Sequence, residues 1–439
     1  MMTQQNTQTT VLRFITCGSV DDGKSTLIGR LLVDAKAVFA DQMEAIGRAK
    51  HKRTVGNNVD LSLLTDGLEA EREQGITIDV AYRYFATPAR TFIIADTPGH
   101  EQYTRNMVTG ASTADAALLL IDPTRVLNGQ LLAQTKRHAA IAKLLGTRQI
   151  IAVVNKMDLI AYSQAKYDAI VGLLNGLSSS LDLPPLTVIP VSALQGDNVV
   201  NPSSTMPWYT GAPLLSLLEQ LPAASLHQRE QPLRFTVQYV IRTDGSAIED
   251  FRGFAGFVAS GSIAVGDAIT VQPSGAAAMV ARLHTYDGDL QAAHAGQAVT
   301  AVLDRDVDVS RGDTLVAAND SKAASNTLTA DLCWMDTAAL NLDRKYWLKI
   351  GAKTTYAKVN AITRVLDIAS LEYSDSHTTS QGVFGLNAIG KATITLQNPV
   401  LVDEYDVNRA TGAFVLIDTS SHQTVAAGMV RTGSSAGHA

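Results

Sequence analysis

Cysteine is scarce in this chain of 439 residues, which contains only Cys17 and Cys333. Two cysteines are too few for the disulfide framework that stabilises many small secreted proteins. Both follow apolar segments of the sequence, and they lie far apart. We therefore expect two buried thiols without chemistry of their own, in a protein of a reducing compartment.

The marks of export and of membrane insertion are also missing. The first ten residues, MMTQQNTQTT, are polar and have neither a basic end nor an apolar stretch, so no secretory signal is predicted. No uninterrupted apolar run approaches the roughly 18 residues of a membrane span. We expect a cytoplasmic protein with no membrane partner.

Positive charge is not in excess either. Lys and Arg number 36 against 42 Asp and Glu, which gives a formal net charge of -6. An overall basic field that would attract a phosphate backbone is therefore absent, and nucleic acid is not an expected partner. Apolar residues at 46% and charged residues at 18% are typical of a globular protein, and the length predicts two or three domains.

The first half of the chain alternates short apolar runs with longer stretches of helical period. This alternation predicts an α/β domain over residues 1–225, with parallel strands joined by helices. The expected strands are 11–16, 91–95, 116–121, 149–154 and 186–191. The expected helices are 24–32, 130–145 and 164–181, with a short one that ends near Pro222.

After residue 233 the pattern changes to short β-rich runs that are broken by Gly and Asp, such as GFAGFVASG and GDAITVQPSG. Closely spaced strands with turn signals favour compact antiparallel barrels. The length left over suits two of them, which we place at 231–322 and 323–430, with a border near Ala323. The last residues, 431–439, are predicted to be a flexible tail.

A phosphate-binding loop directly follows the first predicted strand. GSVDDGKST fits the P-loop pattern, in which glycines let backbone N–H groups close around phosphates and the next helix presents its positive end. The alternative is a glycine-rich turn that matches by accident, which the strand-to-helix position disfavours. The predicted nucleotide-binding residues here are Gly18, Ser19, Val20, Asp21, Asp22, Gly23, Lys24, Ser25 and Thr26.

The sequence NKMD, residues 155–158, identifies the base. A carboxylate at Asp158 can accept two hydrogen bonds from guanine, whereas adenine offers no such pair of donors. Asn155 and Lys156 complete the motif, with the lysine stem packed over the ring. Taken alone, the motif could be a polar turn after a strand. Behind a P-loop it predicts GTP, and Ser192, Ala193 and Leu194 after the next strand are expected near the guanine oxygen.

DTPGH, residues 96–100, ends another strand and predicts the γ-phosphate side of the site. Asp96 is expected to support a nucleotide-bound Mg²⁺, and Gly99 to turn its N–H toward the γ-phosphate. His100 is a candidate for orienting the attacking water, although a lone histidine is often a plain surface residue.

A polar segment between these motifs contains Thr77, whose hydroxyl could reach Mg²⁺ when the triphosphate is present. The neighbouring charge run EAEREQ could equally be a solvated helix face. The predicted metal ligands are thus Ser25, Thr77 and Asp96, and the predicted catalytic residues are His100, Lys24 and Thr77. The expected cofactor is Mg²⁺ with GTP.

The order GSVDDGKS, GITI, DTPGH, NKMD and SA, followed by β-rich barrels, resembles the translation-factor superfamily of GTPases. The resemblance covers nearly the whole chain. It implies an α/β P-loop GTPase domain followed by two small antiparallel β-barrels, and it implies GTP hydrolysis. Ser19, Asp22 and the stretch EQYTRNMVTGAS depart from the elongation-factor pattern.

At these positions the sequence is similar to that of the large, regulatory subunits of bacterial ATP sulfurylases. That resemblance implies a smaller catalytic subunit, which makes adenosine 5′-phosphosulfate and diphosphate from ATP and sulfate in sulfate assimilation, with GTP hydrolysis coupled to the reaction. Some such chains carry a fused adenylylsulfate kinase domain. No second P-loop follows here, so an unfused chain with a separate kinase and a truncated fusion are both compatible with the sequence.

Two other classes of protein share parts of this pattern. A translation elongation factor that carries aminoacyl-tRNA would have the same motifs. The negative net charge of the chain and the amino-acid sequence around Ser19 and after His100 disfavour this alternative. A stand-alone signalling GTPase would leave the barrels without a function. The sequence therefore favours the GTPase subunit of a sulfate-activating enzyme.

Overall fold

The computed structural model describes residues 11–38, 61–64, 77, 79–126, 129–147, 149–222, 228–242, 251–375 and 384–431. The charge run EAEREQ and the predicted tail after Arg431 lie outside these ranges. The described residues form two compact units. One comprises residues up to 223 together with 367–372, and the other comprises the rest.

The first unit is built on a six-stranded sheet. Five of its strands are parallel, and the edge strand β2 pairs antiparallel with β3. In sheet order the strands are β2 (Ala81–Ala86), β3 (Thr91–Asp96), β1 (Val11–Cys17), β4 (Ala116–Ile121), β5 (Gln149–Val154) and β6 (Thr187–Pro190). All five strands expected from the sequence are present.

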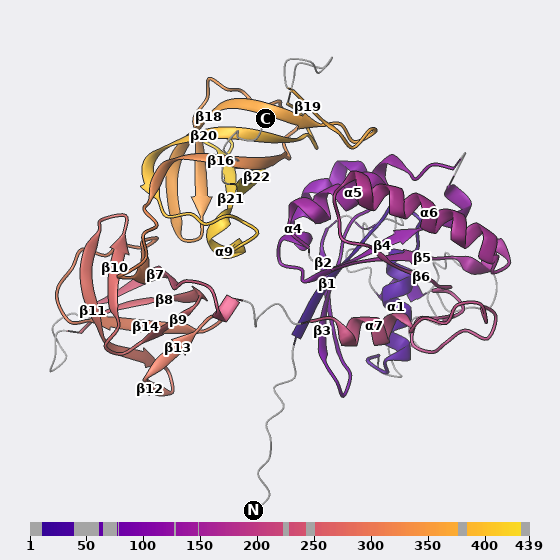
Figure 1. The fold of residues 1–439 in the computed structure, drawn as a ribbon, viewed down its shortest axis with the longest axis horizontal. Helices are drawn as coiled ribbons and strands as arrows, with labels where there is room; N and C mark the ends of the chain where they lie inside the picture. The colour runs from indigo at the N-terminus through magenta and orange to yellow at the C-terminus, as the bar shows by residue number, and fades with distance from the viewer. Residues whose placement is uncertain are drawn as a thin grey trace, which may run out of the picture. The chain divides into compact units, whose positions relative to one another are not determined.

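Helices cover both faces of this sheet, as Figure 1 shows. In that view α4, α5 and α6 lie on one side, and α1 and α7 lie on the other. The α-helices are α1 (Lys24–Asp34), α4 (Thr104–Ser112), α5 (Ala133–Leu144), α6 (Gln164–Ser180) and α7 (Leu214–Gln220). Short 3₁₀ turns are η1 (Leu61–Leu64), η2 (Glu101–Tyr103), η3 (Pro123–Arg125) and η4 (Met157–Ile160).

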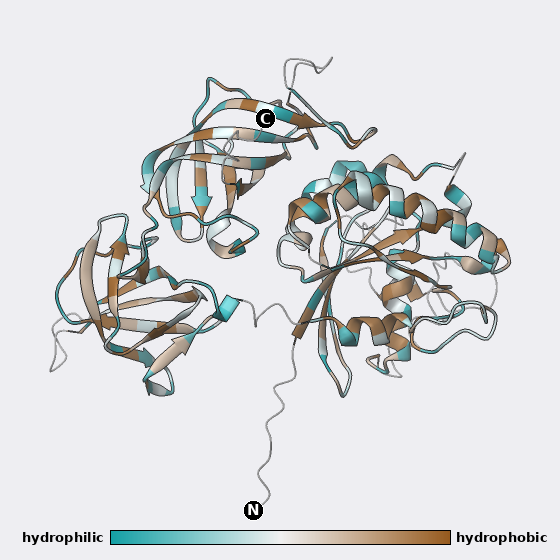
Figure 2. Ribbon diagram, viewed as in Figure 1, coloured by the Kyte–Doolittle hydropathy of each residue, from teal (hydrophilic) through white to brown (hydrophobic). Residues whose placement is uncertain are grey.

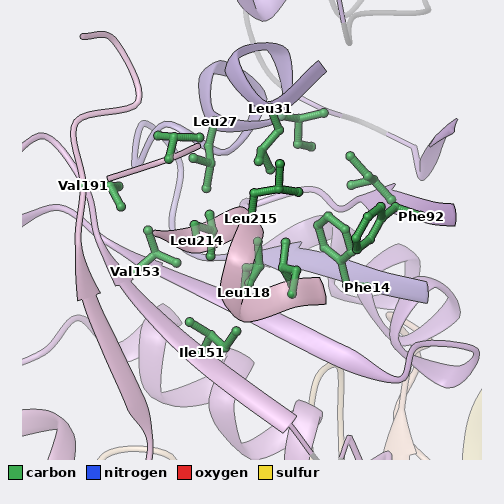
Figure 3. Packing of buried hydrophobic residues seen from close by; sticks show 14 of the residues in the cluster. Phe14, Leu27, Leu31, Phe92, Leu118, Ile151, Val153, Val191, Leu214 and Leu215 are labelled. Carbon is green, nitrogen blue, oxygen red and sulfur yellow. The ribbon is translucent and has the colours of Figure 1, made fainter. Parts of the chain in front are cut away.

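The central strands are apolar because both of their faces are covered. Every residue of β4, AALLLI, is buried, and Figure 2 shows that the inner strands are mostly hydrophobic. Side chains of β1, β3, β4 and β5 pack against α1 and α7 in the main core (Figure 3). Phe14 and Phe92 meet edge to face there, with ring centroids 6.4 Å apart.

One strand and one α-helix of the described part of this unit were not expected from the sequence. The strand β2 runs antiparallel at the sheet edge, and its pattern AYRYFA leaves Tyr84 66% exposed. An exposed edge strand lacks the continuous apolar run of a buried strand, so it gave a weak signal. The helix α4 is short and of mixed polarity, TRNMVTGAS. Elsewhere the predicted helices are present with small shifts, and α5 begins at Ala133 rather than at residue 130.

The second unit begins with a closed barrel. Six antiparallel strands form the ring β10-β15-β7-β8-β14-β11, which the pairing of β10 with β11 closes. The strands of this region are β7 (Arg234–Arg242), β8 (Arg252–Ser260), β9 (Ser262–Ala264), β10 (Ala268–Gln272), β11 (Ala276–Thr285), β12 (Gly288–Leu290), β13 (Ala292–His294), β14 (Ala298–Leu303) and β15 (Thr314–Ala317). Outside the ring, β12 pairs with β11, and β9 and β13 form a separate two-stranded sheet. Alternating apolar side chains fill the interior of the ring.

A second ring of six antiparallel strands follows residues 318–324, in the order β17-β21-β22-β16-β20-β18, and the pairing of β17 with β18 closes it. Its elements are β16 (Ser325–Trp334), β17 (Tyr346–Ile350), β18 (Lys353–Leu366), β19 (Tyr373–Asp375), β20 (Ile389–Val400), α9 (Arg409–Gly412), β21 (Ala413–Asp418) and β22 (Thr424–Arg431). Arg431, which the sequence assigned to the tail, therefore ends a strand. The other proposed domain borders stay predictions.

A buried ion pair connects the two barrels. Arg234 on β7 donates from Nε and Nη2 to the two oxygens of Asp403, at 2.8 and 3.0 Å. Both side chains are almost fully buried. Asp320, in the segment between the barrels, accepts a further bond from Arg234 at 2.5 Å. Planar guanidinium groups suit such two-point contacts, so the barrels are tied at a charged, enclosed joint.

Both cysteines of the chain lie in strands of these sheets, Cys17 in β1 and Cys333 in β16. Cys17 and Cys333 are both buried, as expected, and burial raises the pKa of the Cys17 thiol to about 12. No helix within the described ranges combines the length and apolar character that crossing a membrane would require.

Candidate nucleotide-binding site

The motifs found in the sequence meet at one edge of the sheet. Each follows a strand, and the carboxyl ends of parallel strands lie together at the edge where α/β proteins bind ligands. The segments that meet are 18–26 after β1, 97–100 after β3, 122–125 after β4, 155–158 after β5 and 191–194 after β6.

The P-loop turns into α1 at Gly23, which has a φ of +89°. A side chain there would be strained, and a Cβ would lie only 2.4 Å from Nδ2 of Asn155. Asp21, at the exposed tip of the loop, also has a positive φ of 67°. Ser25 and Thr26 lie in the first turn of α1 and are half-buried. Glycine at position 23 is thus required by conformation and by space.

Lys24 is a buried cation inside this loop. Its Nζ donates to the backbone oxygens of Gly18 and Ser19, at 3.1 and 2.8 Å. Burial lowers the pKa of Lys24, and the carboxylates of Asp22 and Asp96 act in the opposite direction. A desolvated ammonium group held by two carbonyls is suited to exchange those partners for phosphate oxygens.

Asp96 lies beside the loop with both oxygens engaged. Oδ1 accepts from Oγ1 of Thr16 at 2.9 Å, and Oδ2 accepts from Oγ of Ser25 at 3.2 Å. A hydroxyl and a carboxylate side by side are hard oxygen donors of the type that Mg²⁺ prefers, so these two residues fit the predicted metal. Thr77 is half-buried, and residues 76 and 78 lie outside the described ranges. Its role as a ligand stays a prediction.

Gly99 lies directly against the P-loop. A Cβ at this position would be 2.8 Å from the backbone nitrogen of Val20 and 2.4 Å from Nζ of Lys24. Only glycine allows this approach. His100 is exposed, and its Nδ1 accepts a bond from the backbone N–H of Gln102 at 3.3 Å. In this structure His100 therefore caps the short turn η2, and its role in positioning water stays a prediction.

Asn155 joins the phosphate side of the site to the base side. Its Nδ2 donates to the backbone oxygen of Asp22 at 2.9 Å, and its Oδ1 accepts from the backbone N–H of Ala193 at 3.0 Å. Asp158 accepts from Oγ of Ser192 at 2.6 Å. The predicted guanine-binding residues of two separate segments are thus in contact.

Lys156 and Leu194 complete the base side. Lys156 has a left-handed backbone with a φ of 59°, and its Nζ lies 2.8 Å from Oδ2 of Asp122. The backbone oxygen of Leu194 accepts from Arg30 of α1 at 2.5 Å, and that of Ala193 accepts from the same guanidinium at 3.0 Å. These contacts fix both loops of the base side.

Sequence reasoning missed four residues of this site. Asp122, Arg125 and His138 contact the P-loop or NKMD, and Arg30 holds the loop at 193–194. The segment DPTR follows β4 as the recognised motifs follow their own strands, so its position was an available signal. His138 lies within α5, where nothing in the pattern distinguishes it from a core residue.

His138 is a fully buried base behind the P-loop. The backbone N–H of Gly18 donates to its Nδ1 at 2.9 Å, and its Nε2 lies 2.9 Å from Nε2 of Gln134. Burial lowers the pKa of His138 to about 3, and the positive charges of Lys24 and Arg137 act in the same direction. The fold therefore favours the neutral ring.

This environment predicts a pH dependence of stability. Since the folded pKa is about 3 and the unfolded value 6.5, the contribution of His138 is complete above pH 6.5 and is lost as the pH falls. We expect wild type to lose about 1.4 kcal/mol per pH unit below 6.5 relative to His138→Asn. Denaturant titration at pH 7.5 and 5.5 measures this difference. The exposed His422→Asn is the control, and parallel curves for wild type and His138→Asn would refute the assignment.

The class of protein follows from this geometry together with two family matches. Residues 9–227 match the family described as Elongation factor Tu GTP binding domain. Residues 327–431 match the family described as GTP-eEF1A C-terminal domain-like. The GTPase-like domain of S. cerevisiae Ski7, solved with GTP, has a similar fold, with a TM-score of 0.53 and 18% identity over 97% of this chain and 98% of that one. These matches define a GTP-binding protein with the translation-factor fold.

The curated relatives narrow this class. The chain is 49% identical over 424 residues to "Sulfate adenylyltransferase subunit 1" of Aliivibrio fischeri strain MJ11, covering 96% of this chain and 86% of that protein. It is 48% identical to the proteins of the same name from Psychromonas ingrahamii and Methylorubrum populi, covering 96% of this chain and 87% of each. The chain belongs to the sulfate adenylyltransferase subunit 1 family. The resemblance and the fold class expected from the sequence are confirmed.

Proposed function

We propose that this chain is the GTP-hydrolysing regulatory subunit of an ATP sulfurylase. A smaller catalytic subunit would form adenosine 5′-phosphosulfate and diphosphate from ATP and sulfate, and GTP hydrolysis here would be coupled to that reaction. The observation that carries the GTP part is the contact of the P-loop, Asn155, Asp158 and Ser192 in one site. The names of the relatives support the sulfurylase part.

The roles of the residues follow from the geometry. Lys24 and the loop N–H groups would hold the phosphates, and Asp158 would pair with the guanine edge. Ser25 and Asp96 would hold Mg²⁺, which would supply positive charge to the phosphates. His100 would orient the attacking water from its exposed position beside Gly99. This arrangement relies on positioning and electrostatics rather than on a strong base.

Coupling requires a partner that prefers one nucleotide state of this subunit. Thr77 and Gly99 lie in segments whose contacts would change with the γ-phosphate. The binding of a smaller catalytic subunit would then differ between the states. A separate or fused adenylylsulfate kinase as a further partner, and a cytoplasmic location, stay predictions from the sequence.

The test is product formation by the purified complex of this chain with its smaller subunit. We expect adenylylsulfate to form several-fold faster with GTP than without it, and a non-hydrolysable GTP analogue not to support this rate. Equal rates in all three conditions would refute coupling. GTP-dependent capture of aminoacyl-tRNA by the chain would instead identify an elongation factor.

A further inference from the structure

Asp22 is an unusual component of a loop that binds phosphates, because it is itself an anion. Its side chain is fully buried. Oδ2 accepts a bond from the backbone N–H of Ser19 at 2.5 Å, whereas Oδ1 has no hydrogen-bond partner among the described residues. Burial raises the pKa of Asp22 to about 6, and the charge of Lys24 acts against this rise. A buried carboxylate with an unused oxygen is costly, so it calls for an explanation.

The Asp22 carboxylate lies near Gly18, next to the end of β4. A Cβ built on Gly18 would be 3.1 Å from Oδ2 of Asp22 and 2.9 Å from the backbone oxygen of Leu120 on β4. From this position Asp22 is the carboxylate that acts most strongly on the charge of Lys24, ahead of Asp96. The cation expected to bind phosphate therefore already has an internal counter-charge.

Arg125 is the second charge at Asp22. Its Nη1 lies 3.6 Å from Oδ1 of Asp22 and donates to the backbone oxygen of Val20. The Arg125 side chain is 39% exposed, whereas the Asp22 side chain is not exposed at all. Arg125 ends the turn η3, whose first residues are held by Asp122 through bonds to Thr124. A fixed turn thus places a positive charge at the buried anion.

We infer that Asp22 and Arg125 form a charge pair that sets the affinity of the P-loop for nucleoside di- and triphosphates. The Asp22 charge repels the phosphates and competes for Lys24, which favours nucleotide release, and Arg125 limits that effect. The inference rests on the proposed GTP binding at this loop. Charges within about 7 Å in a protein of effective dielectric about 20 alter affinity by about tenfold or more.

A purely structural role for Asp22 is the competing explanation, since its carboxylate also orders Ser19. The substitution Asp22→Asn separates the two, because the amide oxygen can still accept the bond from the Ser19 N–H while the charge is removed. We expect Asp22→Asn to bind GDP about tenfold more tightly, mainly through slower dissociation. A loop that had lost only a structural contact would bind GDP more weakly.

The experiment measures the binding and dissociation of a fluorescent GDP analogue at fixed Mg²⁺ for wild type, Asp22→Asn, Arg125→Gln and the double variant. We expect Arg125→Gln to weaken binding several-fold, Arg125→Lys to recover most of the loss, and Arg125→Gln to have a much smaller effect once Asp22 is Asn. Asp182→Asn, at a fully exposed carboxylate, is the matched control for removal of one negative charge.

The outcomes separate this inference from the proposed function. If Asp22→Asn binds GDP no more tightly than wild type, or if Arg125→Gln costs the same in both backgrounds, the charge pair does not set affinity. If wild type itself fails to bind guanine nucleotides, the proposed GTP function fails together with the inference. Wild-type binding with an unchanged Asp22→Asn variant overturns the inference alone.

Discussion

Lys24→Ala is expected to abolish tight binding of guanine nucleotides while leaving the protein folded. The Nζ group is buried and held by the carbonyls of Gly18 and Ser19, so removing it takes away the charge that phosphates would meet. Two charge-assisted hydrogen bonds contribute roughly 3–6 kcal/mol, which corresponds to about a 10²- to 10⁴-fold loss of affinity. Isothermal titration with GDP measures the effect.

The fold should tolerate this change because burial already disfavours the charged lysine. We therefore expect the circular dichroism spectrum of the variant and the melting of its barrels to match those of wild type. Lys166→Ala is the control, since Lys166 is an exposed lysine on α6. Retained affinity for GDP in Lys24→Ala, at unchanged fold, would show that the phosphates bind elsewhere.

Asp158→Asn is expected to change the base that the site prefers. The carboxylate is oriented by Ser192, which donates to Oδ1 at 2.6 Å, and an amide oxygen can keep that bond. An amide at this position loses an acceptor for guanine and gains a donor for the 2-oxo group of xanthine. Sites built around such pairs discriminate by about 10⁴ or more, so we expect a comparable shift from GTP toward xanthosine triphosphate.

Competition between the two nucleotides for binding measures this shift. Asp168→Asn on α6 removes an exposed carboxylate and serves as the control. If Asp158→Asn keeps the wild-type preference for GTP, the guanine edge is not read by Asp158. If the variant binds neither nucleotide but remains folded, the expected exchange of a guanine-binding acceptor for a xanthine-binding donor is wrong.

The sequence predicted the parts of the site that are formed by short motifs. In such a motif, consecutive residues of fixed type are needed to bind the nucleotide. Gly23 and Lys24 belong to one such motif, and Asn155 and Asp158 to another, and each follows a strand that periodicity had located. The structure brings these segments into contact at one edge of the sheet. The site predicted from the motifs is therefore the place where the sheet topology brings those motifs together.

The missed parts depend on contacts between distant segments. His138 reaches Gly18 across 120 residues of sequence, and Arg125 reaches Asp22 across about a hundred. His138 does not differ in type or spacing from an ordinary core residue, and only the place of its segment after β4 marks Arg125. The strand β2 was missed for a different reason, because its alternating exposed tyrosines at the sheet edge resemble a polar segment.

The joint between the barrels has a mechanical consequence. Arg234, Asp403 and Asp320 are paired at a buried position, so pulling the barrels apart would break the two charge-assisted hydrogen bonds between Arg234 and Asp403. Two charge-assisted hydrogen bonds contribute roughly 3–6 kcal/mol, several times the thermal energy. We therefore expect the two barrels to move together as one rigid body. A partner protein that binds one barrel would then also be displaced when the other barrel moves.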